Sequence, residues 1–244
     1  MKRILLIAAA LALLSGSQVL AADLPPPAAP RPVAYAPPPP FSWTGFYLGI
    51  NGGYGFGQSS WTDPFNGSTG NFNTSGFLIG GTFGANYQIG SFVIGLEGDA
   101  DWNDANGTTF SVAGACNPAP GFIGGCTTQS DWLATIRGRA GFAWDRVLFY
   151  GTGGVAFGDV QAAAGGFPFA SGTQTGWTVG AGIEWAFAPN WTGKVEYLYV
   201  DLGNYSCPAT SCGATNGAGL FSPSTVTFTE NIIRAGINYK FGWW

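Results

Sequence analysis

The stretch "LATIRGRAGFAW", residues 133–144, decides how this chain folds. Apolar side chains recur at every second position, which is the period of a β-strand with two different faces. Ile136 and Phe142 fall on one face, while Arg137 and Arg139 fall on the other. Because burying an unpaired charge is expensive, the face that carries the two arginines must meet partner carboxylates.

A second stretch, residues 92–102, supplies those carboxylates. It alternates apolar residues with Glu97, Asp99 and Asp101. If the two stretches are antiparallel neighbours with Glu97 opposite Arg139, the same register places Asp99 opposite Arg137. Bidentate pairs of this kind are strong and geometrically specific.

A tight turn at residues 188–190 is expected to join two further strands, 177–187 and 191–199, and to set Glu184 opposite Lys194. The sequence therefore predicts an interior ion-pair network. Its members are Glu97, Asp99, Asp101, Arg137, Arg139, Glu184, Lys194, Glu196 and Arg234, with Glu230 and Lys240 able to extend it.

The same two-residue alternation occurs eight times along the chain. The expected strands are 43–56, 76–89, 92–102, 131–142, 147–158, 177–187, 191–199 and 233–241. Short turns near 90–91, 144–146 and 188–190 alternate with connections expected to be long polar loops, at 57–73, 103–129, 159–173 and 203–224. This plan is typical of an all-β, eight-stranded antiparallel transmembrane up-and-down β-barrel.

Composition decides which face of the barrel points outward. Aromatic residues make up 16% of the chain and charged residues only 9%, against about 25% charged in ordinary soluble domains. The lumen of so small a barrel is filled by side chains, so the many rings belong outside, facing hydrocarbon. A soluble, lipocalin-like barrel would have to expose its glycine-rich face to water. An interfacial aromatic girdle is expected from Trp43, Trp102, Trp132, Trp185, Trp191 and Tyr199.

The first forty residues carry export and linker signals. Residues 1–22 read as a signal peptide, with a basic start, an apolar core and small residues at the cleavage site. Residues 23–40 hold nine of the 16 prolines and are expected to form an extended tether in the periplasm. The barrel is assigned to residues 41–244.

The four cysteines allow three pairings, and two local disulfides are favoured in an oxidising compartment. They are Cys116 with Cys126 and Cys207 with Cys212. The alternative, a metal site, would need more ligands than the chain offers, because it has no histidine. No metal or cofactor is therefore expected.

The absence of histidine also excludes Ser-His-Asp and Cys-His catalysis. The carboxylates of the predicted network are better explained as structural than as catalytic, since ion-pair networks often mimic active sites. A formal net charge of −4 leaves no basic patch for nucleic acid. We therefore expect neither an enzyme nor a nucleic-acid-binding protein.

Several motifs, in order along the chain, resemble the RopB-type major outer-membrane protein family of α-proteobacteria, a group of small porin-family or OmpA-like barrels. They are "ADLPPP", "FSWTGFYLGINGGYGFG", "TIRGRAGFAW", "GTGGVAFG", "GWTVGAGIEWAF", "VEYLYVDLG" and "IIRAGINYKF". The resemblance implies an abundant, immunogenic protein of the Gram-negative outer membrane, linked to envelope integrity and host contact. The loop cysteines are not carried over from that family.

Barrels of that group usually end on a phenylalanine that the assembly machinery reads. Here the expected assembly signal comprises Tyr239 and Phe241, followed by Trp243 and Trp244. The implied partners are outer-membrane lipid, lipopolysaccharide and the assembly machinery, with peptidoglycan a further candidate for the tether.

Two functions remain open at this point. The first is a structural, surface-exposed barrel that supports the envelope and presents its loops. The second is a narrow porin-like channel for small solutes, which would require a continuous aqueous path past Arg137 and Arg139. A lipid-modifying enzyme is disfavoured because the chain has no histidine.

Overall fold

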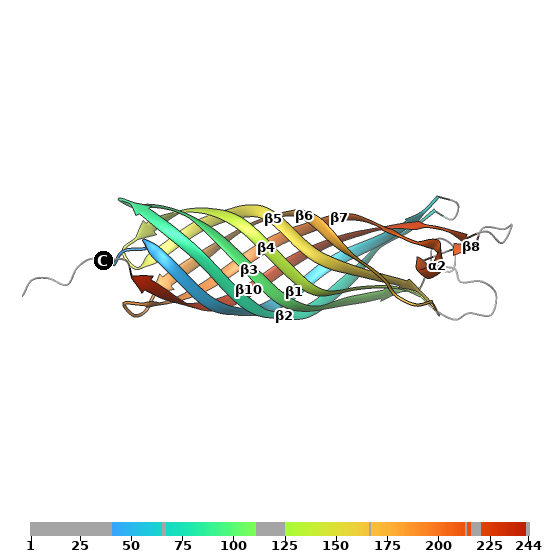
Figure 1. Ribbon diagram of the computed structural model, residues 1–244, viewed down its shortest axis with the longest axis horizontal. Helices are drawn as coiled ribbons and strands as arrows, with labels where there is room; N and C mark the ends of the chain where they lie inside the picture. Colours follow the sequence, from blue (N-terminus) through green and yellow to red (C-terminus); the bar gives the residue numbers. More distant parts are fainter. Residues whose placement is uncertain are drawn as a thin grey trace, which may run out of the picture. The chain divides into compact units, whose positions relative to one another are not determined.

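The chain forms a closed barrel of eight long strands, shown in Figure 1. The computed structural model describes residues 41–64, 67–110, 125–165, 167–212, 214–215 and 221–242. The expected signal peptide and tether, residues 1–40, lie outside the described residues. The barrel strands are β1 (Gly45–Asp63), β2 (Gly67–Ile89), β3 (Phe92–Thr109), β4 (Cys126–Trp144), β5 (Val147–Ala164), β6 (Ala170–Ala186), β7 (Trp191–Cys207) and β10 (Ser224–Gly242).

Every neighbouring pair of barrel strands is antiparallel, and β1 closes the barrel by pairing with β10. The eight-stranded up-and-down architecture predicted from the sequence is confirmed. Closure leaves no free sheet edge among these strands, so each backbone ladder has a partner on both sides. Among the described residues, no helix is long and apolar enough to cross a membrane.

The short turns gather at one end of the barrel, which we call the turn end, and the longer connections gather at the loop end (Figure 1). Two-residue turns join β2 to β3 and β4 to β5. Gly90 and Asp145 take positive φ angles of 62° and 51° in these turns, as tight hairpins of this length require.

The outward phase is the one that composition indicates. Ile136 is 63% exposed and Phe142 is 49% exposed, whereas Arg137 between them is fully buried. The outward apolar residues form a band around the turn-end part of every strand. On β3, for example, this apolar band runs from Phe92 to Trp102, close to the roughly 9–11 residues that a strand needs to cross a bilayer.

Beyond the apolar band, all eight strands continue toward the loop end in a second section that we call the extension. Here the chemistry of the two faces is reversed while the alternation keeps its phase. On β1, Gln58 and Thr62 point outward and are exposed, and Trp61 points inward and is fully buried. The extension is polar outside and apolar inside, as is usual for a barrel in water.

The interior of the extension is filled by an apolar cluster that we call the loop-end plug. Its buried members include Trp61, Leu133, Val160, Leu198, Leu202, Val226 and Phe228. Burying a Leu or Phe side chain contributes roughly 1.5–3 kcal/mol. The extension is therefore a folded part of the barrel with a core of its own.

The expectation of four long polar loops is wrong for much of their length. Residues 57–63 and 67–73 are strand, and the connection between them shrinks to 64–66. Likewise, β3, β5 and β7 continue into the ranges 103–129, 159–173 and 203–224. The prediction fails because it expected every strand to carry apolar residues on its outer face. Beyond the bilayer the outward residues of these strands are polar, and a polar segment resembles a loop.

The turn end is closed by a second cluster, the turn-end plug. It contains Trp43, Val93, Ala143, Leu148 and Tyr150, with Phe41 packed against them. Trp43 is therefore not part of the outward aromatic girdle, which corrects the expectation. It is 1% exposed, and its indole Nε1 donates to the Asp145 carbonyl at 3.4 Å. The other predicted girdle tryptophans, Trp102, Trp132, Trp185 and Trp191, are exposed on the outer face.

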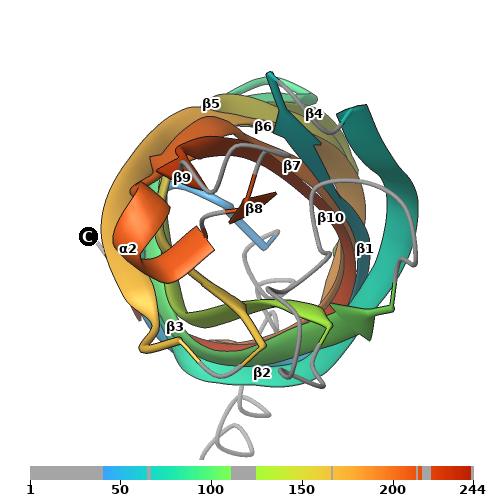
Figure 2. The same cartoon turned by 90° about the vertical axis from the view of Figure 1, so that its right-hand side faces the viewer.

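Short elements lie at the loop-end mouth, as Figure 2 shows. They are the one-turn helix α2 (Ala209–Cys212) and the two-residue strands β8 (Ala214–Thr215) and β9 (Phe221–Ser222), which pair with each other. A disulfide joins Cys207 at the end of β7 to Cys212 in α2, and Ser224 Oγ donates to the Cys212 carbonyl at 3.1 Å. The predicted pairing of these two cysteines is confirmed.

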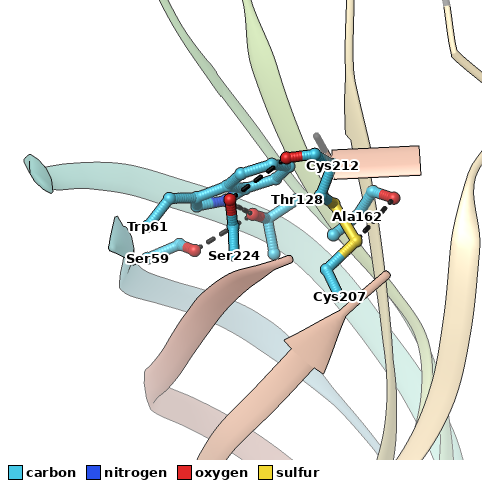
Figure 3. Close-up of a disulfide and its surroundings, with 7 residues drawn as sticks. All are labelled: Ser59, Trp61, Thr128, Ala162, Cys207, Cys212 and Ser224. Atoms are coloured by element: carbon cyan, nitrogen blue, oxygen red, sulfur yellow. Dashed lines mark hydrogen bonds between the residues drawn. A yellow bond between two sulfur atoms is a disulfide. The ribbon is translucent and has the colours of Figure 1, made fainter. Parts of the chain in front are cut away.

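The disulfide lies within the loop-end plug, whose buried residues include both of its cysteines (Figure 3). Cys207 Sγ lies 3.9 Å from the Ala162 carbonyl oxygen on β5. Beside it, the Trp61 indole donates to Thr128 Oγ1 at 3.0 Å, so the buried indole keeps a hydrogen-bond partner. Cys126 is also disulfide-bonded, and its predicted partner Cys116 lies outside the described residues.

The reversal of polarity along each strand predicts where a cysteine can be labelled. In protein reconstituted into liposomes, Thr62→Cys should react with a membrane-impermeant maleimide, because it lies outward on the extension. Leu48→Cys, outward on the same strand within the apolar band, should react at least tenfold more slowly. The described native cysteines form disulfides and do not interfere. Equal labelling of the two sites would show that the band is not covered by lipid.

Removing the disulfide should loosen α2 without opening the barrel. Closing so short a loop is worth only about 2 kcal/mol. In Cys207→Ser/Cys212→Ser, the amides of Ser211 and residue 212, which donate to the Pro208 carbonyl at 3.0 and 2.9 Å, should exchange hydrogen at least tenfold faster. Amides of residues 92–102 serve as the control and should be unchanged. Uniform acceleration along the chain would assign the disulfide a global role instead.

Candidate functional site

The centre of the lumen, within the apolar band, holds a layer of ionic side chains that we call the ionic layer. All nine residues of the sequence-predicted network make ion pairs there. They come from β3, β4, β6, β7 and β10. Each points inward because it occupies the phase opposite to the exposed apolar residues, and each is at most 6% exposed.

Glu97 is the hub of the ionic layer. Its Oε1 lies 2.5 Å from Arg137 Nη2, and its Oε2 lies 3.3 Å from Arg139 Nη1 and 3.0 Å from Lys194 Nζ. The Tyr47 hydroxyl also donates to Oε2, at 2.7 Å. One carboxylate thus links four strands, β1, β3, β4 and β7.

Arg234 organises the part of the ionic layer nearer the loop end. It contacts Asp99 Oδ2 at 3.0 Å, Asp101 Oδ2 at 2.8 Å and Glu196 Oε2 at 2.8 Å. Arg137 bridges the two halves, since it contacts Asp99 and Glu196, at 2.8 and 3.0 Å, as well as Glu97. Such shared, charge-assisted contacts are strongly coupled, and removing one member leaves buried charges without partners.

Arg139 lies nearer the turn end, between two tyrosine rings. Its Cζ is 4.0 Å from the ring centroid of Tyr150 and 5.6 Å from that of Tyr47, a cation–π arrangement. Its Nη2 lies 2.7 Å from Glu184 Oε2. Glu184 Oε1 accepts from Thr192 Oγ1 at 2.5 Å and from Asn238 Nδ2 at 3.0 Å, so both oxygens of this carboxylate have partners.

The register between β3 and β4 differs by two residues from the predicted one. Glu97 lies opposite Arg137, and Arg139 lies opposite Gly95. No short turn joins these two strands, so turn geometry does not set their register. The long guanidinium side chains still reach both carboxylates, which is why Arg139 contacts Glu97 and Arg137 contacts Asp99.

Across the turn between β6 and β7, Glu184 does lie opposite Lys194, as the turn length predicts. The two side chains nevertheless choose other partners. Lys194 Nζ reaches across the lumen to Glu97, and Glu184 pairs with Arg139. Backbone register therefore does not determine the pairing in so narrow a lumen, where side chains from opposite walls meet.

Glu230 and Lys240 do not extend the ionic layer. Glu230 Oε2 accepts from Asn103 Nδ2 at 3.2 Å, between the ionic layer and the loop-end plug, and within the described residues it makes no ion pair. Lys240 donates to the Ser42 carbonyl at the turn end, and its Nζ lies 4.4 Å from the Phe41 ring centroid. Neither side chain takes part in the ion pairs of the described residues, so the expected extension of the network is wrong.

Sequence reasoning missed the neutral members of the ionic layer, which are Tyr47, Tyr150, Thr135, Thr192 and Asn238. Each of these side chains hydrogen-bonds a carboxylate of the ionic layer. A signal for them existed, because a large polar residue in the inward phase of a glycine-rich strand, such as Tyr47, has only the lumen to enter.

The remaining predicted residues lie away from the ionic layer. Tyr239 and Phe241 of the expected assembly signal are outward on β10, 38% and 49% exposed, and their rings are 5.1 Å apart. Trp243 and Trp244 lie outside the described residues. In the described part of the chain, no group of three His, Cys, Asp or Glu side chains is arranged to hold a metal ion.

Comparison with known proteins places this chain in a family. Residues 7–241 match the model of the outer membrane protein beta-barrel domain. The chain is 36% identical to the 31 kDa outer-membrane immunogenic protein of Brucella melitensis over 259 residues, covering 99% of this chain and all of the relative. It is 31% identical to the 22 kDa outer membrane protein of Rhizobium leguminosarum bv. viciae, covering 83% of this chain and 80% of the relative.

Among solved structures, the outer membrane protein OprG from Pseudomonas aeruginosa is similar at 13% identity and a TM-score of 0.47, covering 82% of this chain and 99% of that one. The family match spans nearly the whole barrel, and the two relatives in sequence come from α-proteobacteria, as the motifs had implied. The chain therefore belongs to the outer membrane protein beta-barrel domain family and is a small β-barrel of the Gram-negative outer membrane.

Proposed function

We propose that this protein is a closed structural barrel that stiffens the outer membrane and carries a folded extension beyond the lipid. The observation that supports this best is that the lumen is filled at three successive levels. These levels are the turn-end plug, the ionic layer and the loop-end plug.

The three levels exclude water by different means. Trp43 in the turn-end plug and Trp61 in the loop-end plug are at most 1% exposed, so an indole lies at each end. Between them, Arg137 and Arg234 are each bound to three carboxylates and are at most 1% exposed. A solute crossing the barrel would have to displace an apolar plug, break several coupled ion pairs and displace a second plug.

The alternative, a narrow channel, needs a continuous hydrated path. The pairing of Glu97 with three cations across the lumen argues against one. Such a carboxylate offers no free charge to guide an ion, because its charge is already neutralised at contact distance. We therefore rank the channel second.

We also propose that the barrel has no enzymatic activity. The chain has no histidine, and the carboxylates of the ionic layer are bound by cations and by neutral donors such as Thr192 and Asn238. A general acid or base must reach its substrate within hydrogen-bond distance. Side chains this deeply buried could not do so.

The proposed partners follow from exposure. Lipid and lipopolysaccharide surround the apolar band. The assembly machinery would read the outward rings of Tyr239 and Phe241 at the end of β10, together with Trp243 and Trp244. The proline-rich stretch 23–40 would link the barrel to the periplasm, where peptidoglycan is its candidate contact.

Breaking the ionic layer should destabilise the barrel strongly. Arg137→Ala removes one partner from three carboxylates, and uncompensated buried charge of this kind costs about 3–5 kcal/mol. We expect a lower urea midpoint and a lower temperature for the heat-induced shift in gel migration. Arg146→Ala is the matched control, since Arg146 is exposed at the β4–β5 turn. Equal midpoints for the two variants would contradict a coupled ionic layer.

The closed lumen predicts the outcome of electrical recordings. Pure refolded wild-type protein in planar bilayers should give no steady current above the protein-free baseline at about 100 mV in 1 M KCl, conditions in which a water-filled pore conducts. The same preparation should show heat-modifiable migration, as proof that it is folded. Stable, reproducible openings would favour the porin-like alternative.

A further inference from the structure

At the loop-end edge of the apolar band, the outer face of the barrel carries a groove of about 640 Å³. Four consecutive strands of the barrel, β7, β10, β1 and β2, form it. The aromatic side of this rim groove comes from Tyr54, Phe56 and Tyr199, and the polar side comes mainly from Gln58, Asn73 and Asn231. It therefore lies where the lipid-facing surface gives way to the polar extension.

Two amide side chains of the rim groove are held in place by hydrogen bonds. Asn231 Oδ1 accepts from the Tyr197 hydroxyl at 2.6 Å, and Asn231 Nδ2 donates to the Phe56 carbonyl at 3.3 Å. Gln58 Oε1 accepts from Asn71 Nδ2 at 3.0 Å. These contacts hold the amides in place, so a ligand would not have to order them.

Other polar groups of the rim groove are free to bind a ligand. Among the described residues, the side chains of Asn73 and Ser75 and the hydroxyls of Tyr54 and Tyr199 have no hydrogen-bond partner. Together they offer amide and hydroxyl groups that can both donate and accept. The rings beside them present flat faces with a negative π-surface, which attracts the slightly positive C–H groups of a ligand.

The charge of the rim groove also bears on which ligand it could take. No charged side chain lines it. On other strands, the exposed Asp104 and Asp131 lie beside the outward rings of Trp102 and Trp132. On β7, Asp201 is half-buried opposite Thr229 at the edge of the groove, and its Oδ1 accepts from the Gly203 amide at 2.8 Å. Exposed carboxylates repel phosphate, and the lining of the rim groove itself is uncharged and rich in amides.

We propose that the rim groove binds uncharged sugar residues of a glycolipid in the outer leaflet, a proposal that rests on the membrane-embedded closed barrel proposed above. The apolar band directly beneath it is covered by acyl chains, so the group at this level is the head of a lipid. Concave sites with an apolar wall and a few fixed polar groups are the usual form of small-ligand sites. Alternating ring faces, amides and hydroxyls suit a pyranose, which has apolar C–H faces and a polar edge.

The test compares two glycolipid probes on full-length folded protein in detergent, by native mass spectrometry. One probe is rough lipopolysaccharide with its core oligosaccharide, and the other is lipid A alone. We expect the wild type to prefer the core-bearing probe at least fivefold. Gln58→Ala/Asn73→Ala should abolish that preference, because it removes two amides that lie opposite each other on β1 and β2.

A matched control exists on the other side of the barrel. Asn106 and Gln129 lie opposite each other on β3 and β4, so Asn106→Ala/Gln129→Ala removes the same pair of residue types outside the rim groove. It should keep the wild-type preference. Tyr199→Leu, which removes one ring but keeps an apolar surface, should reduce the preference and serves if the amide variant folds poorly.

Three results would overturn the proposal. The first is equal binding of the two probes by wild type, and the second is equal loss in both double variants. The third is binding of the free core oligosaccharide as tightly as the whole glycolipid, which would make the ligand a soluble sugar. Heat-modifiable migration, measured in parallel, reports on the barrel itself, so a failed sugar site would leave the closed structural barrel standing.

Discussion

A charged side chain inside an eight-stranded barrel has to find its partners in the protein, because the lumen is too narrow to hydrate it. The rest of this structure follows from that constraint. Glu97, Arg137 and Arg234 each contact at least three oppositely charged groups, and tyrosine, threonine and asparagine side chains hydrogen-bond to the carboxylates. The walls of the barrel are thereby joined through its centre as well as along its backbone ladders.

The two surroundings of the barrel explain how its faces change along each strand. Within lipid, the backbone must be fully paired and the outer face must be apolar, which leaves the inward phase for the ions. In water beyond the lipid, the outer face becomes polar, and the inward phase fills with Trp61, Phe228 and their neighbours. Each strand keeps the same alternation of inward and outward residues along its whole length. In lipid the outward residues are apolar and the inward ones polar, and beyond the lipid the reverse holds.

The barrel therefore has distinct regions along its axis. The turn-end plug, the ionic layer and the loop-end plug close the lumen, and the disulfide between Cys207 and Cys212 holds α2 at the loop-end mouth. With the lumen filled, the surfaces available for recognition are on the outside. The rim groove, whose lining carries no charged side chain, is one such surface.

Local alternation and composition together were enough to predict the strand count, the closed antiparallel barrel, the outward rings and the membership of the nine ionic residues. A period of two marks the strands and sorts their residues onto two faces without knowledge of distant contacts, and the composition of the two faces indicates which of them meets lipid. The local disulfide between Cys207 and Cys212 was predictable for a similar reason, since only four residues separate the two cysteines.

The register of β3 against β4, the choice of partners within the ionic layer and the position of Trp43 were decided by the tertiary structure alone. No short turn ties β3 to β4, and long side chains from opposite walls compete for the same carboxylates, as Lys194 and Arg139 do for Glu97. The extension, too, could not be predicted from the sequence. Whether an alternating polar segment is a loop or a strand depends on whether its inward residues meet a core, and that core exists only once all eight strands have closed around it.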